Sequence, residues 1–337
     1  MNLMNNQIVL TSLPKGKLNT TNFNFKKTML PVPKVGEVLG RTLYIAIDAA
    51  SRAWMQADTY RPILRDNELM PGLALVEVME SQVGHLKPGD LIIAETGWQT
   101  YLTIPANKLV ALPEIEPLTN LLSIFGVPGL TAYFGLLQCG LPKPGDTLVV
   151  SAAAGAVGSI VGQIGKIKGC TVVGIAGGVE KCNILVEQFG FDSVVNYKEG
   201  NIEENLRLTC PNGIDIYFDN VGGSILDAVL SNMANYGRIV CCGAISQYDQ
   251  KKLDVGPIGI PGQIILKSLI MKGFLLFDFL HEQDRAIQDL EKWVKSGSII
   301  VQEDIIDGFE KLPEALVGVL NGENVGKRIV KVANRNE

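Results

Sequence analysis

The feature that most constrains this fold is a short apolar run that ends in a glycine turn and leads into an amphipathic segment. Residues 147–151 are almost continuously apolar, which is typical of a parallel strand buried on both faces. Gly155 and Gly158 follow, and in residues 156–168 apolar side chains recur at steps of three and four, as on one helix face. This order predicts a βαβ unit whose turn can receive a phosphate. The alternative is an ordinary βα turn that uses glycine for tight packing, since alanine replaces the first glycine of the full fingerprint.

Strand-like and helix-like segments go on alternating through the middle of the chain. Repeated strand–helix units predict a parallel sheet with right-handed crossovers, so we expect a doubly wound α/β domain of Rossmann type. The predicted strands cover residues 147–151, 171–175, 193–195, 214–218 and 238–242, and the predicted helices cover residues 156–168, 180–189 and 281–295.

The first 120 or so residues are β-rich instead. Short strand-like runs cover residues 43–47, 73–78 and 91–94, with a Pro-Gly-Asp turn in residues 86–90. Short strands at this spacing predict a small barrel-like domain. From about residue 300 onward we expect strands again, the last of which, residues 327–332, returns to the first domain.

Length and composition limit the class of protein. The chain has 337 residues, which is typical of two domains, and a hydrophobic fraction of 47% can fill two cores. A net charge of −5 without any cluster of Lys and Arg argues against a nucleic-acid partner. No apolar run is long enough for a membrane span, and residues 1–17 lack a signal-peptide pattern, so we expect a cytoplasmic protein. The 6 cysteines form no C-x-x-C pair and are expected to be reduced thiols.

The second predicted strand of the α/β region bears on which dinucleotide would bind. It ends in Ile175-Ala176-Gly177-Gly178, without the Asp or Glu that an NAD-preferring site places on the ribose 2′-OH. Lys181 follows, and its ammonium would attract a 2′-phosphate that a carboxylate would repel. We therefore expect NADPH, although Lys181 by itself is better explained as a solvated surface lysine, and only together with the missing acid do the two interpretations become about even.

The supply of metal ligands bears on the reaction class. Zinc-assisted hydride transfer needs Cys or His ligands in the first domain, but residues 1–138 contain no cysteine and one histidine, His85, beside a turn. We predict no metal site. A substrate carbonyl must then be activated by hydrogen bonds from a tyrosine, a ribose hydroxyl or water. A conjugated carbonyl suits this activation, because hydride addition at its β-carbon yields a stabilised enolate.

Several motifs together resemble the medium-chain dehydrogenase/reductase superfamily. The first resemblance is carried by residues 126–133 (GVPGLTAY) and 152–158 (AAAGAVG). Four more motifs resemble the zinc-free branch of prostaglandin reductases, leukotriene B4 12-hydroxydehydrogenases and 2-alkenal reductases: EKC at 180–182, FDNVGG at 218–223, CGAIS at 242–246 and ENVGK at 323–327. The resemblance covers nearly the whole chain.

The resemblance implies a domain organisation. It implies a GroES-like β-barrel domain formed by residues 1–125 and 300–337, and a Rossmann NADPH-binding domain formed by residues 126–299. It also implies a homodimer, which we expect to form by edge-strand pairing of the nucleotide domains.

The resemblance also implies roles for individual residues. Lys181 and Tyr197 would hold the adenosine 2′-phosphate. The pyrophosphate would lie on Gly155, Ala156, Val157, Gly158 and Ser159, and the nicotinamide half on Asn220, Cys242, Gly243, Ala244, Ile245, Ser246, Tyr248, Phe274, Leu275, Leu276 and Asn324. Two alternatives stay open: residues 274–276 as a plain core strand, and Asn324 as a turn residue.

Two departures from the family pattern concern the substrate. An Asp-Pro-Tyr-Met-Arg-like stretch of the family is here Asp48-Ala49-Ala50-Ser51-Arg52, and Arg52 is the predicted substrate residue. Residues 259–263 (GIPGQ) lack a pocket tyrosine that many relatives have. Tyr248 and Tyr60 are then the candidate catalytic phenols, and each could equally be a packed amphipathic side chain.

Together these features predict an NADPH-dependent reductase of the C=C bond of α,β-unsaturated aldehydes and ketones that works without zinc. Hydride would reach the β-carbon, and solvent, a ribose hydroxyl or Tyr248 would protonate the enolate. The alternatives are an NADPH-dependent quinone reductase of the same fold and a non-catalytic NADPH-binding protein.

Overall fold

A computed structural model describes residues 4–249 and 259–335 and divides into two compact units. Unit 1 comprises Met1–Leu122, Asp304–Glu323 and Arg328–Glu337, and unit 2 comprises Ser123–Glu303 and Asn324–Lys327. The expected C-terminal block 300–337 is therefore shared between the units, because residues 300–303 and 324–327 belong to unit 2. In the described part of the chain, no helix is both long enough and apolar enough to cross a membrane.

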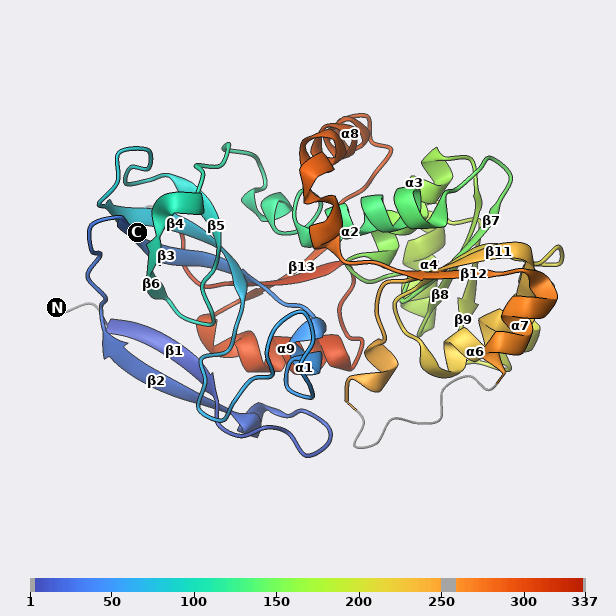
Figure 1. Ribbon diagram of the computed structural model, residues 1–337, viewed down its shortest axis with the longest axis horizontal. Helices are drawn as coiled ribbons and strands as arrows, with labels where there is room; N and C mark the ends of the chain where they lie inside the picture. Colours follow the sequence, from blue (N-terminus) through green and yellow to red (C-terminus); the bar gives the residue numbers. More distant parts are fainter. Residues whose placement is uncertain (1–3, 250–258, 336–337) are drawn as a thin grey trace. The chain divides into compact units, whose positions relative to one another are not determined.

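Unit 2 is built on a six-stranded sheet in the order β12-β11-β10-β7-β8-β9 (Figure 1). All five strand pairs are parallel. The strands are β7 (Thr147–Ser151), β8 (Thr171–Ala176), β9 (Ser193–Asn196), β10 (Ile214–Asp219), β11 (Met233–Cys241) and β12 (Ile270–Gly273). The chain winds outward from β7 in both directions, so the strand order reverses between β7 and β10, which is where doubly wound folds bind ligands.

Both faces of this sheet are buried, which explains the continuous apolar run in β7. Leu148 and Val150 belong to the apolar cluster that contains Ile160 and Val161 of α3, while Val149 belongs to the cluster that contains Leu206 and Val229 on the other side. The helices of unit 2 are α2 (Val127–Phe134), α3 (Gly158–Ile167), α4 (Val179–Glu187), α5 (Ile202–Thr209), α6 (Gly223–Asn232), α7 (Ile260–Lys267) and α8 (Gln283–Lys295). The predicted strands and the three predicted helices of this unit are confirmed to within a few residues.

Unit 1 is an antiparallel assembly. One sheet has the order β13-β14-β3-β4-β5, with β6 also paired to β3, and β1 and β2 form a separate pair. Its elements are β1 (Met4–Leu10), β2 (Phe23–Met29), β3 (Glu37–Ala46), α1 (Ala50–Ala53), β4 (Leu73–Ser81), β5 (Leu91–Glu95), β6 (Tyr101–Pro105), β13 (Glu303–Asp307), α9 (Leu312–Leu320) and β14 (Lys327–Lys331).

The long strand β3 changes partner along one edge. Its first half pairs with β6 and its last residues pair with β14, while β4 follows the opposite edge. A register shift between Thr42 and Tyr44 marks the bend, as expected where a sheet curls toward a barrel. The pairing of β14 with β3 confirms that the last strand returns to the first domain.

One element after residue 300 was predicted wrongly. We expected only strands there, but α9 lies between β13 and β14. Pro313 stands in its first turn, and Leu312, Ala315 and Leu316 are all buried at helical spacing. Burial on nearly every side hides the amphipathic pattern by which the other helices were recognised.

Candidate functional site

The turn after β7 is tightly folded. Ala152 has a positive φ of 46°, and its carbonyl accepts the Gly155 N–H at 2.9 Å. A methyl group on Gly158 would lie 2.4 Å from the Ala152 oxygen, so only glycine lets α3 start this close to the strand. Val157 precedes α3 and has no side-chain oxygen to cap it, which leaves the helix N-terminus able to receive an anion. The predicted residues 155–159 therefore lie together in one turn, at the start of α3, whose geometry could receive an anion.

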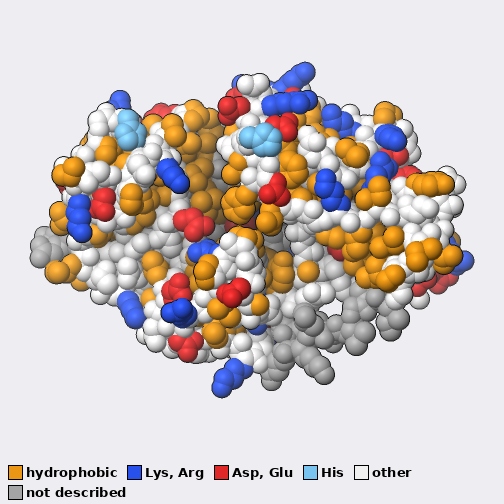
Figure 2. All heavy atoms as spheres, viewed as in Figure 1, with side chains coloured by type: hydrophobic (Ala, Val, Ile, Leu, Met, Phe, Trp, Pro, Cys, Tyr) orange, Lys and Arg blue, Asp and Glu red, His pale blue; other side chains and the backbone are white. Residues whose placement is uncertain are grey.

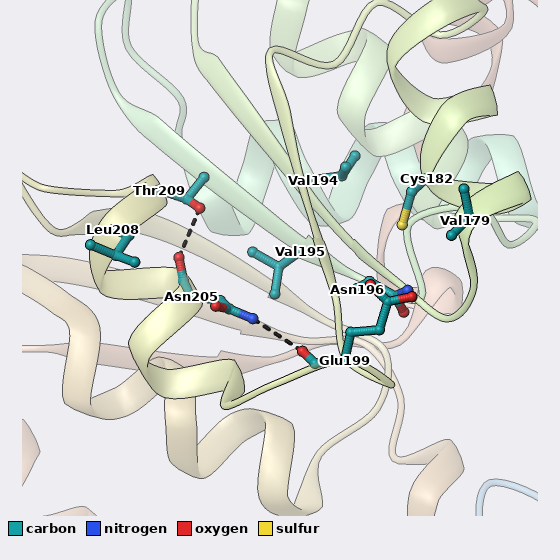
Figure 3. Close-up of a pocket in the computed structure, with 9 residues that line it drawn as sticks. All are labelled: Val179, Cys182, Val194, Val195, Asn196, Glu199, Asn205, Leu208 and Thr209. Carbon is teal, nitrogen blue, oxygen red and sulfur yellow. Dashed lines mark hydrogen bonds between the residues drawn. The ribbon is translucent and has the colours of Figure 1, made fainter.

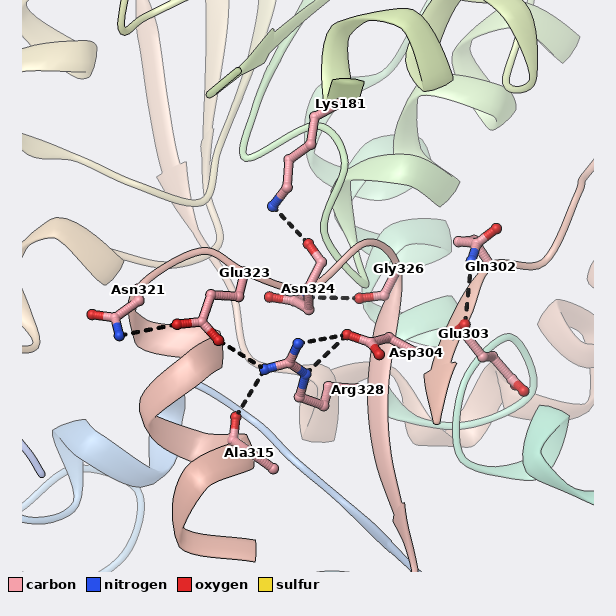
Figure 4. Close-up of polar contacts among 10 residues, drawn as sticks. All are labelled: Lys181, Gln302, Glu303, Asp304, Ala315, Asn321, Glu323, Asn324, Gly326 and Arg328. Atoms are coloured by element: carbon pink, nitrogen blue, oxygen red, sulfur yellow. Dashed lines mark hydrogen bonds and ion pairs between the residues drawn. The ribbon is translucent and has the colours of Figure 1, made fainter. Parts of the chain in front are cut away.

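A second segment, far away in the sequence, crosses this turn. The Gly326 N–H donates to the Ala154 carbonyl at 2.7 Å, and Gly155 and Gly326 form a parallel bridge. Asn324 Nδ2 donates to the Gly326 carbonyl at 2.8 Å, while the Asn324 carbonyl accepts the Lys181 ammonium at 2.7 Å (Figure 4). The side-chain amide of Asn324 thus has the turn role considered above. Its backbone carbonyl holds Lys181 close to the turn of residues 155–158, called here the phosphate-type turn.

Lys181 and Tyr197 follow neighbouring strands. Lys181 lies in the first turn of α4, after β8, and Tyr197 directly follows β9. The Tyr197 ring packs on Gly177, where a Cβ would come within 2.7 Å of Cε1. Because parallel strands end at the same sheet edge, these two predicted residues lie on adjoining loops.

A buried carboxylate organises the point where the strand order reverses. Asp219, at the end of β10, is 3% exposed, and its Oδ1 accepts the Tyr217 hydroxyl at 2.8 Å and the Val221 and Gly222 N–H groups at 2.9 and 2.8 Å. Ser151 Oγ lies 3.3 Å away as a further donor. Burial raises the pKa of Asp219 despite these hydrogen bonds. Sequence reasoning did not select Asp219, although it lies inside the quoted FDNVGG motif.

Two loops are joined at this position. The Asp219 carbonyl accepts the N–H groups of Cys242 and Gly243, and Ser246 Oγ donates to the Val221 carbonyl at 2.6 Å. Asn220 Nδ2 points back to the Ser151 carbonyl at 2.8 Å. The structure therefore brings the predicted residues 220 and 242–246 together at the carboxyl ends of β10 and β11.

Tyr248 closes the second loop on itself. Its hydroxyl accepts the Ala244 N–H at 3.3 Å, and burial raises the pKa of Tyr248, so the phenol stays protonated at neutral pH. A hydroxyl that accepts one hydrogen bond keeps its own proton to donate.

Residues 274–276 lie just beyond β12 and not inside a strand. Phe274 fits against Gly135, where a Cβ would come within 2.5 Å of the ring, and meets Phe279 edge-on with centroids 6.3 Å apart. Phe274 and Leu276 pack against the core of unit 2, whereas Leu275 is exposed. The alternative of a core role thus fits two of the three residues, and their nicotinamide role stays a prediction.

The two candidates of the first domain lie in unit 1. Arg52, in α1, is 2% exposed, and its Nη2 donates to the Gly16 carbonyl at 2.8 Å, so it anchors a neighbouring loop. Tyr60 is exposed, with its ring edge-on to Trp54. The substrate role of Arg52 and the catalytic role of Tyr60 stay predictions.

A cavity of about 400 Å³ opens beside the edge strand β9 (Figure 3). Side chains of α4, β9, α5 and the loop between β9 and α5 line it: Val179, Cys182, Val194, Val195, Asn196, Glu199, Asn205, Leu208 and Thr209. None of the predicted site residues lines this cavity.

His85 and the cysteines do not form a shared metal-type cluster in the described part of the chain. His85 Nε2 lies 3.1 Å from the Ala106 carbonyl, and the six cysteines are free thiols. Within residues 4–249 and 259–335, no three His, Cys, Asp or Glu side chains gather in a way that could hold a metal ion.

Known proteins resemble this chain over almost its full length. Residues 6–112 match a family model described as the N-terminal domain of oxidoreductase, and residues 156–294 match one described as zinc-binding dehydrogenase. Prostaglandin reductase 1 of Bos taurus is 43% identical over 94% of this chain and 95% of its own. The NADP(+)-dependent 2-alkenal reductase of Nicotiana tabacum is 38% identical over 98% of both chains. The crystal structure of CurA from Vibrio vulnificus in complex with NADPH superposes with a TM-score of 0.93, at 40% identity, covering 98% of this chain and 99% of that chain.

Proposed function

Because the chain belongs to the medium-chain dehydrogenase/reductase superfamily, in the branch that contains prostaglandin reductases and 2-alkenal reductases, we propose that it reduces the C=C bond of α,β-unsaturated aldehydes and ketones with NADPH. The observation that carries this proposal is the meeting of the Gly155–Gly158 turn, Lys181 and Asn324 in one place. A helix N-terminus for the pyrophosphate and an ammonium for the 2′-phosphate are the two positive groups that NADPH requires.

The end of β8 fits the same cofactor. Ala176, Gly177 and Gly178 carry no charge that would repel a 2′-phosphate, and the Tyr197 ring covers Gly177. When bound, the dinucleotide supplies the hydride for the β-carbon of the substrate. Residues 220 and 242–246 would hold its nicotinamide half, at the carboxyl ends of β10 and β11.

Tyr248 supports the proton side of the reaction. The phenol is neutral at neutral pH, so its hydroxyl can donate a hydrogen bond to a substrate carbonyl and stabilise the charge that develops on the enolate oxygen. We propose Tyr248 as the protein's proton donor, with solvent as the alternative that a Tyr248→Phe variant distinguishes.

The test is a substrate panel. The protein is mixed with NADPH and a set of enals, enones and benzoquinones, and consumption of NADPH is followed at its near-ultraviolet absorbance. Turnover of enals or enones is expected. Faster turnover of benzoquinones than of every enone would make the protein a quinone reductase, and tight NADPH binding without any turnover would make it a binding protein.

We further propose that two copies pair through β12. This edge strand and the neighbouring α7 and Leu276–Glu282 helix expose Ile265, Leu266, Ile270 and Phe277 to between 59% and 79%. Figure 2 shows apolar side chains gathered over this region. An open, apolar strand edge invites pairing with an identical edge across a two-fold axis.

The pairing can be tested by light scattering after gel filtration. The wild type is expected to run as a dimer and Ile270→Lys as a monomer. Ile300→Lys, which places the same charge at another exposed isoleucine outside this surface, is the control and is expected to stay dimeric. A monomeric wild type, or a dimeric Ile270→Lys variant, would contradict the proposed interface.

A further inference from the structure

Asn196 joins the two loops that carry Lys181 and Tyr197. It is the last residue of β9, and its Oδ1 accepts two backbone N–H groups, from Gly178 at 3.0 Å and from Lys198 at 3.2 Å. Gly178 belongs to the β8–α4 loop, three residues before Lys181, and Lys198 follows Tyr197. One side chain therefore fixes both loops at once.

The β8–α4 loop needs such a restraint. Gly177 and Gly178 have no side chains to pack, and Gly178 has a positive φ of 98°. Glycine loses the most conformational freedom on ordering, so a Gly-Gly pair holds one geometry only when its backbone is bonded. The Gly178 N–H donates to Asn196 Oδ1. The conformation of this loop sets where α4 begins and therefore where Lys181 lies.

The choice of asparagine is informative. The Nδ2 atom of Asn196 is buried and has no hydrogen-bond partner among residues 4–249 and 259–335. A buried, unsatisfied amide is unfavourable, so stability alone does not explain this residue. Aspartate would offer the same acceptor without the unpaired donor, but it would add a negative charge at the end of the strand next to β8. That charge would oppose a 2′-phosphate, as the acid at the end of the second strand does in NAD-preferring sites.

We propose that Asn196 is a positioning residue for NADPH selectivity. It holds the β8–α4 loop and the Tyr197 turn in the geometry that receives a 2′-phosphate, and it does so without charge. This inference rests on the proposed NADPH-dependent function and names a residue that acts through Lys181 and Tyr197.

The first test measures the affinity of the full-length protein for NADPH and for NADH by titration calorimetry. This readout does not depend on turnover. In Asn196→Ala, affinity for NADPH is expected to fall about tenfold. This is about the change expected when the displaced Lys181 and Tyr197 together lose one hydrogen bond to the charged 2′-phosphate. Affinity for NADH and kcat at saturating NADPH are expected to change less than about twofold. Asn232→Ala is the control, because the Asn232 side chain likewise bonds two backbone groups of unit 2, in this case by donating Nδ2 to the carbonyls of Glu203 and Ala228. It is expected to leave the NADPH-to-NADH affinity ratio unchanged.

The second test separates the acceptor from the charge. Amide hydrogen exchange at Gly178, measured without nucleotide, is expected to speed up in Asn196→Ala and to stay slow in Asn196→Asp. Asn196→Asp is nevertheless expected to bind NADPH more weakly than the wild type while binding NADH normally.

The outcomes decide between the alternatives. Equal losses of NADPH and NADH in Asn196→Ala, or unchanged exchange at Gly178, would overturn the positioning role. An Asn196→Asp variant that binds NADPH as tightly as the wild type would overturn the argument from charge. If the wild type does not prefer NADPH at all, the proposed function is itself wrong and the inference falls with it.

Discussion

Replacing Asp219 tests whether the loops at the strand-order reversal depend on an acceptor or on a charge. Asp219→Ala removes the oxygen that accepts the Tyr217 hydroxyl and the Val221 and Gly222 N–H groups. Asp219→Asn keeps an acceptor oxygen, removes the charge and replaces the other carboxylate oxygen by an NH2 group. The two variants thus separate two contributions that the carboxylate makes together.

The expected magnitudes follow from these bonds. Each buried donor left without a partner costs roughly 1–3 kcal/mol, and Asp219→Ala leaves three such donors. Removing a buried carboxylate, whose pKa is raised by burial, returns part of that loss. We therefore expect Asp219→Ala to lower the free energy of unfolding by about 3–5 kcal/mol and Asp219→Asn to change it by about 1 kcal/mol or less.

Urea denaturation of the two variants and the wild type, followed by circular dichroism, measures both values. The denaturant slope m must be the same in all three proteins for the comparison to report stability alone. A loss below about 1 kcal/mol in Asp219→Ala would mean that water replaces the carboxylate without cost. Equal losses in both variants would mean that charge, and not the acceptor oxygen, holds the loops.

Three further predictions concern packing, the cofactor and pH. Gly162→Ala is expected to destabilise the protein by about 1–3 kcal/mol in thermal denaturation although alanine favours helices, because its methyl would lie 1.9 Å from the Phe191 ring. Gly262→Ala, at a helical glycine with nothing within 4 Å of an added Cβ, is the control and should be neutral or stabilising. Lys181→Ala is expected to weaken NADPH binding at least about tenfold more than NADH binding in the same titration, and equal losses would refute the 2′-phosphate role. Because the pKa of Asp219 is raised in the folded state, its stabilising contribution is present at acid pH, below the unfolded pKa, and is lost as pH rises through the folded pKa. The free energy of unfolding of the wild type relative to Asp219→Asn should therefore fall over that pH range. A difference that stays constant with pH would contradict the shift.

The parallel sheet could be predicted because burial on both faces leaves a continuous apolar run in each central strand. The phosphate-type turn could be predicted for a similar reason, since Gly158 is required by a close approach of helix and strand that few other residues allow. In both cases the physical cause acts over a few neighbouring residues and is visible in the sequence.

The supporting residues of the site could not be predicted in this way. Asp219 and Asn196 act by accepting backbone N–H groups, and one of these bonds, from Gly178 to Asn196, joins positions that only the β8–β9 pairing brings together. A polar residue at the end of a strand looks the same in the sequence whether it binds a ligand or a loop. Arg52 was proposed only from the resemblance of residues 48–52 to a family motif, and the sequence did not indicate that its side chain also donates to the Gly16 carbonyl.

The bridge between Gly155 and Gly326 has a consequence for biosynthesis. The turn at Gly155–Gly158 is made near the middle of the chain, but the segment that crosses it and the carbonyl that holds Lys181 come from residues 324–326. A contact between positions so far apart forms late in folding, after the intervening chain has been ordered. On the ribosome, where domains fold as they emerge, unit 2 would therefore stay incomplete until residues 324–326 have left the exit tunnel.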